Sequence, residues 1–198
     1  MLYDLQNHNR QTIRLKGYDY AQPGAYFVTI CAWQRACLFG KIENGVIYLE
    51  QAGQDAQSEW LRLAKRFHNA DFSEFVVMPD HVHGIIVIKD TVCRGTAECR
   101  NDLIIELASR APDHERFGHP VAGSIPTIVR SYKSAVTLQV NHLFQNSNRP
   151  VWQRNYYEHV IRNEADFELI HKYIQGNQWM WAEDQLNPDI LPSQFHQE

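Results

Sequence analysis

Two histidines separated by one residue form the first pattern in this sequence with a chemical meaning. His81 and His83 lie in the stretch MPDHVHGIIV at positions 78–87. Because side chains alternate between the two faces of a strand, both imidazoles are expected to point the same way, about 7 Å apart along the strand. Such a pair can converge on one cation, and an otherwise apolar strand is a costly place for unpaired polar groups. The pattern also suits two histidines satisfied by hydrogen bonds at a sheet edge.

A tyrosine and an asparagine four residues apart make the second pattern. Tyr173 and Asn177 share one face of a predicted helix, because residues four apart are neighbours on a helix surface. Ile170 and Ile174 form the adjacent apolar stripe, which would dock the helix on a sheet with the tyrosine at the edge. Gly176 favours an end or a bend of the helix near Asn177. Periodicity by itself favours an ordinary core tyrosine at position 173.

The placement of these residues depends on the predicted strands and helices. Aromatic and β-branched runs predict strands, and apolar residues every three to four positions predict helices. The expected strands cover 25–31, 45–50, 72–78, 81–88 and 156–161, and the expected helices cover 51–67, 126–144 and a segment capped by Asn163 with Asp166. This order predicts an α+β fold with a mainly antiparallel central sheet of about five strands, flanked by helices.

The length of 198 residues suits one domain with a hydrophobic core. We expect this domain to cover residues 15–181. Residues 89–123 are charged and weakly periodic, which indicates an insertion loop with a short helix at 103–108. Residues 182–198 contain two prolines and four acids without Lys or Arg, and we expect a loosely ordered acidic tail.

Composition distinguishes between soluble, secreted and membrane proteins. A content of 44% hydrophobic and 21% charged residues is typical of soluble globular domains. The polar N-terminus does not resemble a signal peptide, and no apolar run approaches the roughly 20 residues that span a bilayer. A cytoplasmic protein without a membrane partner is therefore expected, with its four cysteines reduced.

The net charge of −4 hides a locally basic segment. The four acids of the tail account for this negative net charge, whereas residues 119–162 contain five Lys or Arg residues and the single acid Glu158. This charge suits a modest phosphate-binding surface and equally suits scattered solvated charge. It is too small for a long non-specific footprint on duplex DNA.

Taken together, four stretches resemble the single-tyrosine HUH transposases, and most closely the REP-associated tyrosine transposases. They are MPDHVHGIIV at 78–87, IVRSYKSAV at 128–136, VWQRNYYEHVIR at 151–162 and YIQGN at 173–177. The resemblance covers residues 15–181 apart from most of the 89–123 insertion. Family members commonly have proline directly after the asparagine, where this chain has Gln178.

The resemblance implies a ferredoxin-like HUH nuclease domain and a set of site residues. His81 and His83 match the metal-binding histidines, and Asn177 matches the polar side chain that completes the metal site. Tyr173 matches the nucleophile. The implied cofactor is a divalent metal ion, Mg²⁺ or Mn²⁺. The implied enzyme is a tyrosine transposase that binds, nicks and rejoins single-stranded DNA with palindromic hairpins through a 5′-phosphotyrosine, as a monomer or homodimer.

Basic residues near aromatic ones suit contacts with single-stranded DNA. The predicted DNA-binding residues are Arg130, Lys133, Arg154, Arg162, Trp152, Tyr156 and Tyr157. Packing of strands is the competing interpretation for the tyrosines. Two other functions stay open: a domesticated protein that binds hairpin DNA without strand transfer, and a metal-dependent hydrolase of small substrates. The presence of all four implied site residues favours the transposase over a pure binding protein.

Overall fold

The computed structural model describes residues 18–90, 121–145 and 149–181. The elements are β1 (Gly24–Cys31), η2 (Trp33–Arg35), β2 (Gly40–Glu43), β3 (Val46–Leu49), α1 (Gln51–Arg66), β4 (Ala70–Val77), β5 (His81–Ile88), α3 (Ile125–Leu143), β6 (Tyr157–Ile161) and α4 (Glu164–Met180). The predicted α+β class is confirmed. The predicted helix at 103–108, most of the 89–123 insertion and the 182–198 tail lie outside the described residues. Within those ranges, no helix has both the length and the apolar composition needed to cross a membrane.

Four strands form one antiparallel sheet in the order β4-β5-β1-β6. With α1 and α3 they follow the path β-α-β-β-α-β, the connectivity of a ferredoxin-like domain. β1 and β5 occupy the centre and pair along their full length, with Cys31 opposite His81. The two histidines therefore stand on a central strand and not at a sheet edge.

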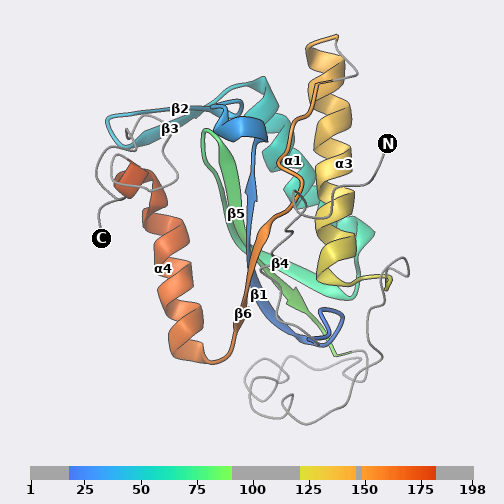
Figure 1. The fold of residues 1–198 in the computed structure, drawn as a ribbon. Coiled ribbons are helices and arrows are strands. Elements are labelled where there is room, and N and C mark those ends of the chain that lie inside the picture. The colour runs from blue at the N-terminus through green and yellow to red at the C-terminus, as the bar shows by residue number, and fades with distance from the viewer. Residues whose placement is uncertain (1–17, 91–120, 146–148, 182–198) are drawn as a thin grey trace, which may run out of the picture.

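Helices cover both faces of this sheet, as expected for a strand that is apolar on both sides. In Figure 1, α1 and α3 lie on one side of the sheet and α4 lies on the other. Val82 and Ile86 belong to the core beneath α1 and α3, whereas Ile85 packs with Ile174 of α4. Because side chains alternate along β5, the histidines at 81 and 83 share the α4 face with Ile85.

Gly84, directly after the histidine pair, leaves room for the side chain of Trp60, the largest in the core. Trp60 of α1 is fully buried, and a Cβ on Gly84 would lie 2.2 Å from its ring. Phe75 of β4 stacks on the Trp60 ring with 5.5 Å between ring centroids, and Tyr132 of α3 meets Trp60 edge to face at 5.3 Å. This packing anchors β5 firmly on α1 and α3.

The segment at 45–50 does not join the central sheet, which has four strands where about five were expected. β3 pairs instead with β2 in a separate hairpin. Asn44 and Gly45 form its turn with φ values of 53° and 75°, the left-handed conformation that matches the twist of a two-residue hairpin. An Asn-Gly pair is the usual sequence signal of this turn, so the hairpin was predictable.

The helix that carries Tyr173 begins where it was predicted. Asn163 caps α4, because its Oδ1 accepts a hydrogen bond of 2.8 Å from the Asp166 backbone N–H. The expected end or bend near Asn177 was wrong, since α4 passes Gly176 and continues to Met180. Tyr173 and Asn177 therefore lie on one continuous helical face.

Candidate active site

The two histidines converge at one point beneath α4. Their Nε2 atoms lie 2.9 Å apart, and both side chains are buried at the start of β5. The alternation of strand side chains predicted a shared face, and this is confirmed. The pairing of β5 with β1 fixes the backbone on which His81 and His83 stand.

Each histidine binds a neighbouring side chain through its other ring nitrogen. His81 Nδ1 lies 2.7 Å from Asp80 Oδ1, and His83 Nδ1 lies 2.8 Å from Thr29 Oγ1. Because a carboxylate only accepts hydrogen bonds, His81 Nδ1 carries the proton of a neutral ring and Nε2 keeps its lone pair. The Thr29 hydroxyl can accept as well as donate, so His83 can adopt the same tautomer. Two such lone pairs facing each other repel unless a proton or a cation lies beside them.

The surroundings of His83 disfavour positive charge on its ring. Burial lowers the pKa of His83 well below its ordinary value, and the neighbouring His81 and Arg35 act in the same direction. Phe27 contributes to this burial, because its ring stacks on His83 with 5.2 Å between centroids. His83 is therefore a neutral imidazole near pH 7, the form that binds metal ions.

Tyr173 reaches the histidine pair from α4. Its hydroxyl lies 3.3 Å from His83 Nε2, the nitrogen that also faces His81. Phe27 meets the tyrosine ring edge to face at 6.1 Å between centroids, which restrains the ring. Tyr173 contacts His83 and is still 43% exposed to solvent. This placement allows a large substrate to approach the hydroxyl.

Asn177 follows one helical turn after Tyr173 and is buried, with 1% of its surface exposed. One turn further on, the ring centroid of Trp181 lies 6.1 Å from that of His81. Residues that reach the two histidines therefore flank Asn177 on its own helical face. In the described part of the chain, neither Oδ1 nor Nδ2 of Asn177 has a hydrogen-bond partner. A buried amide without partners is costly and calls for an explanation such as an ion.

These donors fit a divalent metal ion. Two ligand atoms about 2.1 Å from an octahedral ion and about 90° apart are separated by about 3.0 Å. The observed separation of the two Nε2 atoms is 2.9 Å. Among the described residues, no group of three or more His, Cys, Asp or Glu side chains could hold a metal ion. The buried, unpartnered oxygen of Asn177 is a candidate for a third donor. Imidazoles also suit Zn²⁺ and Ni²⁺, so the ligand type does not select the metal.

Two of the predicted DNA contacts come from a helix on the other face of the sheet. Arg130 and Lys133 belong to α3, on the opposite side of the sheet from α4 (Figure 1). Lys133 Nζ donates hydrogen bonds of 2.9 Å to the backbone oxygens of Gln153 and Asn155. Burial lowers the pKa of Lys133 to about 8. Lys133 therefore fastens the segment before β6 to α3.

Trp152 is not available as a stacking surface, which corrects the sequence prediction. It is buried against Tyr132, and its Nε1 donates a hydrogen bond of 3.1 Å to the Lys133 backbone oxygen. Tyr156 is half-buried, with the Lys133 ammonium 5.8 Å from its ring centroid. Tyr157, by contrast, is 48% exposed on β6, so its ring is accessible for stacking.

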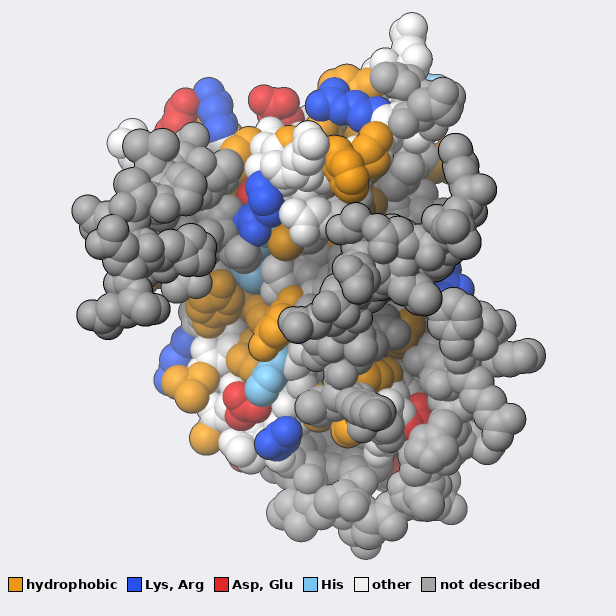
Figure 2. All heavy atoms as spheres, in the orientation of Figure 1, with side chains coloured by type: hydrophobic (Ala, Val, Ile, Leu, Met, Phe, Trp, Pro, Cys, Tyr) orange, Lys and Arg blue, Asp and Glu red, His pale blue; other side chains and the backbone are white. Residues whose placement is uncertain are grey.

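The remaining basic candidates are exposed but separated. Arg154 precedes β6 and Arg162 follows it. On the face shown in Figure 2, Lys and Arg side chains stand apart from one another, among hydrophobic and acidic ones.

Three residues around the histidines were not predicted as parts of the site. Thr29 and Asp80 bind the histidine Nδ1 atoms, and Arg35 Nε donates a hydrogen bond of 2.7 Å to Asp80 Oδ2. Asp80 directly precedes the His-x-His pattern, and that adjacency was a usable signal. Thr29 comes opposite His83 only through the pairing of β1 with β5, which no local pattern indicates.

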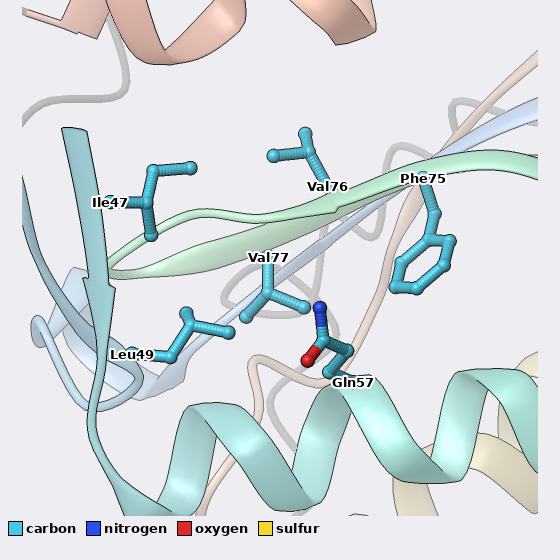
Figure 3. A pocket seen from close by; sticks show the side chains of 6 residues that line it. All are labelled: Ile47, Leu49, Gln57, Phe75, Val76 and Val77. Atoms are coloured by element: carbon cyan, nitrogen blue, oxygen red, sulfur yellow. The ribbon is translucent and has the colours of Figure 1, made fainter. Parts of the chain in front are cut away.

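A separate open pocket of about 220 Å³ is formed by β3, α1 and β4 (Figure 3). Its lining residues are Ile47, Leu49, Gln57, Phe75, Val76 and Val77. None of the predicted site residues lines it, and Gln57 is its one polar side chain. It offers no ionisable group for chemistry.

Comparisons with known proteins bear on the fold and the family. No family model matches the sequence. A Haemophilus influenzae protein of uncharacterised function is 39% identical over 188 residues, which cover 94% of this chain and 98% of that protein. A solved REP-associated tyrosine transposase bound to a REP hairpin matches with a TM-score of 0.52 and 17% identity, over 84% of this chain and 72% of that one. A candidate transposase from Deinococcus radiodurans matches with a TM-score of 0.43 and 17% identity, over 83% and 98% of the chains.

Proposed function

This chain belongs to the family of the Haemophilus influenzae protein and has the fold of a REP-associated tyrosine transposase, and we propose that it transfers DNA strands. The observation that carries this proposal is the Tyr173 hydroxyl, 3.3 Å from His83 Nε2. The hydroxyl of a half-exposed tyrosine thus lies beside one of two convergent imidazoles. The proposed reaction is the nicking and rejoining of single-stranded DNA through a 5′-phosphotyrosine.

His81, His83 and Asn177 are the proposed ligands of Mg²⁺ or Mn²⁺. When bound, such an ion would supply Lewis-acid chemistry to a phosphate and would help to orient it. The buried amide of Asn177 supports this assignment, because an ion would satisfy its oxygen. Asp80 and Thr29 bind the two Nδ1 atoms, and this leaves both Nε2 atoms facing each other, where an ion would bind.

Tyr173 is the proposed nucleophile. Its oxygen forms a bond to phosphorus while the bond from phosphorus to the 3′ oxygen breaks, leaving a 5′-phosphotyrosine and a 3′-hydroxyl. The phenol has an ordinary pKa of about 10, so its proton must be removed during attack, and the departing 3′ oxygen gains one. The tyrosine ester remains a reactive phosphodiester. A 3′-hydroxyl can therefore attack it and reseal the strand, which hydrolysis would not permit.

Single-stranded DNA with a hairpin is the proposed substrate. The transposase that shares this fold was solved bound to a REP hairpin. Here Tyr157 is exposed at the start of β6, and Arg154 and Arg162 are exposed before and after this strand. Stacking of an unpaired base on an aromatic ring contributes about 1–3 kcal/mol, and this suits a single strand.

A covalent adduct on a denaturing gel tests the proposal. The protein is mixed with labelled single-stranded DNA that contains the palindromic repeats flanking its gene, with Mn²⁺ or with a chelator. We expect a metal-dependent adduct that is absent from Tyr173→Phe. Tyr48→Phe is the matched control, because Tyr48 is 50% exposed on β3 and has no place in the proposed chemistry.

The outcomes separate the enzyme from its alternatives. An adduct that persists in Tyr173→Phe would refute the nucleophile. Hairpin binding without any adduct, in protein shown to be loaded with Mn²⁺, would instead indicate a domesticated binding protein. Turnover of a small phosphodiester without an adduct would indicate a hydrolase.

A further inference from the structure

A buried carboxylate bridges two donors next to the histidine pair. Asp80 is completely buried in the turn between β4 and β5. Its Oδ1 lies 2.7 Å from His81 Nδ1, and its Oδ2 accepts a hydrogen bond of 2.7 Å from Arg35 Nε. Each carboxylate oxygen therefore faces a different donor. This arrangement leaves the carboxylate no freedom to rotate without losing one of its partners.

The fold holds Arg35 in place for this contact. Arg35 ends η2 with a left-handed φ of 59°, an uncommon conformation for a residue other than glycine. The Ala32 backbone N–H, just before η2, donates a hydrogen bond of 2.8 Å to the Asp80 backbone oxygen. The end of β1 is thus tied to the turn that carries Asp80. The side chain of Arg35 is 23% exposed, whereas the carboxylate that it binds is completely buried.

We propose that Asp80, oriented by Arg35, is a positioning residue that keeps the proton of His81 on Nδ1 and its Nε2 lone pair toward the metal. This inference rests on the proposed metal site and extends it beyond the direct ligands. Partners that bind the second nitrogen of a metal-bound histidine fix its tautomer and ring orientation. Thr29 faces His83 in the corresponding place but can also donate, so it holds the tautomer less strictly.

Replacing the carboxylate by an amide in Asp80→Asn should change the tautomer of His81. An amide has one oxygen to accept and an NH₂ group that only donates. Arg35 Nε always carries a proton and takes the single oxygen. The NH₂ group then faces His81 Nδ1, which must accept, so the ring proton moves to Nε2 and blocks the ligand atom. The variant keeps nearly the same shape while reversing the tautomer.

Two measurements on the same variants test this inference. Long-range proton–nitrogen correlation spectra of the histidine rings, recorded without metal, report which nitrogen carries the proton. Titration with Mn²⁺, followed by the electron paramagnetic resonance of the free ion, reports metal affinity. We expect Asp80→Asn to move the His81 proton to Nε2 and to weaken Mn²⁺ binding by about 10- to 100-fold.

A pair of double variants separates positioning from simple structural damage. Arg35→Met with Asp80→Asn removes the buried charge pair but frees the amide oxygen for His81, so the Nδ1 proton and most of the Mn²⁺ affinity should return. Arg35→Met with Asp80→Leu removes the same charges and the acceptor, and should leave affinity about 10- to 100-fold weaker. Both remain informative if the single variant does not fold. Asp166→Asn is the control, because Asp166 lies 3.1 Å from His159 Nε2 in another Asp–His pair.

The results also distinguish this inference from the function on which it rests. If the two double variants bind Mn²⁺ equally and His81 has the same tautomer in both, Asp80 does not position the ring and the inference is wrong. If the wild-type protein binds no Mn²⁺, the proposed metal step fails, and the tautomer spectra alone then decide the role of Asp80. A loss of affinity in Asp166→Asn equal to that in Asp80→Asn would also overturn the assignment.

Discussion

Asn177→Ala should make the metal-free protein more stable while removing its response to metal. The side chain is 1% exposed, and within the described ranges neither of its polar atoms has a hydrogen-bond partner. A buried polar group left unsatisfied costs about 1–3 kcal/mol. Alanine also favours a helix interior by up to about 0.7 kcal/mol over asparagine. Loss of the packing of the removed atoms opposes these gains by about 1 kcal/mol.

The net expectation is a gain of about 1–2 kcal/mol in the free energy of unfolding, or about 2–8 °C in Tm for a chain of this size. Thermal and urea unfolding in the presence of a chelator measures it. Asn163→Ala is the matched control on the same helix. Its Oδ1 caps α4 by accepting from the Asp166 N–H, so its loss should cost about 0.5–2 kcal/mol.

Addition of Mn²⁺ should reverse the order of wild type and Asn177→Ala. A ligand at about 100 times its Kd stabilises the folded state by about 2.7 kcal/mol. The wild-type protein should show a rise of this kind, and Asn177→Ala should show little. If Asn177→Ala destabilises the metal-free protein as Asn163→Ala does, the amide is an ordinary structural group and our reasoning about the ligand set is refuted.

Two further predictions concern the scaffold around the site. Gly84→Ala should lower the free energy of unfolding by about 1–3 kcal/mol, because its Cβ would lie 2.2 Å from the Trp60 ring. Gly176→Ala should raise the free energy of unfolding by about 0.5–1 kcal/mol, because a Cβ at this position meets no atom within 4 Å. If urea unfolding shows that both variants change stability in the same direction, this description of the packing is contradicted. Burial lowers the pKa of Lys133 from 10.5 to about 8, so between these values the unfolded chain binds more protons than the folded one. The stability of the wild type relative to Lys133→Met should therefore rise with pH across that window, and a flat difference in a pH series of urea unfolding would count against the shift.

Local patterns predicted most of the elements because each strand or helix shows its own periodicity in the sequence. The strand at 81–88 and the helix from 51 were found within a residue or two of their observed bounds. The errors came from tertiary context. Trp152 looked suited to stacking on DNA, but its ring is buried and its indole N–H is bound to α3. Gly176 looked like a helix end, but α4 continues past it to Met180.

The sequence alone determined that His81 and His83 share a face and that Tyr173 and Asn177 share another. Both statements follow from the repeat of a single strand or helix, which is a local property of the chain. Only the tertiary structure brought these faces together, because the distance from Tyr173 to His83 depends on how α4 docks across β1 and β5. The same is true of Arg35 and Asp80, which are far apart in sequence and meet where β1 ends beside the turn before β5. Periodicity specifies the direction of a side chain, whereas packing between elements decides what it reaches.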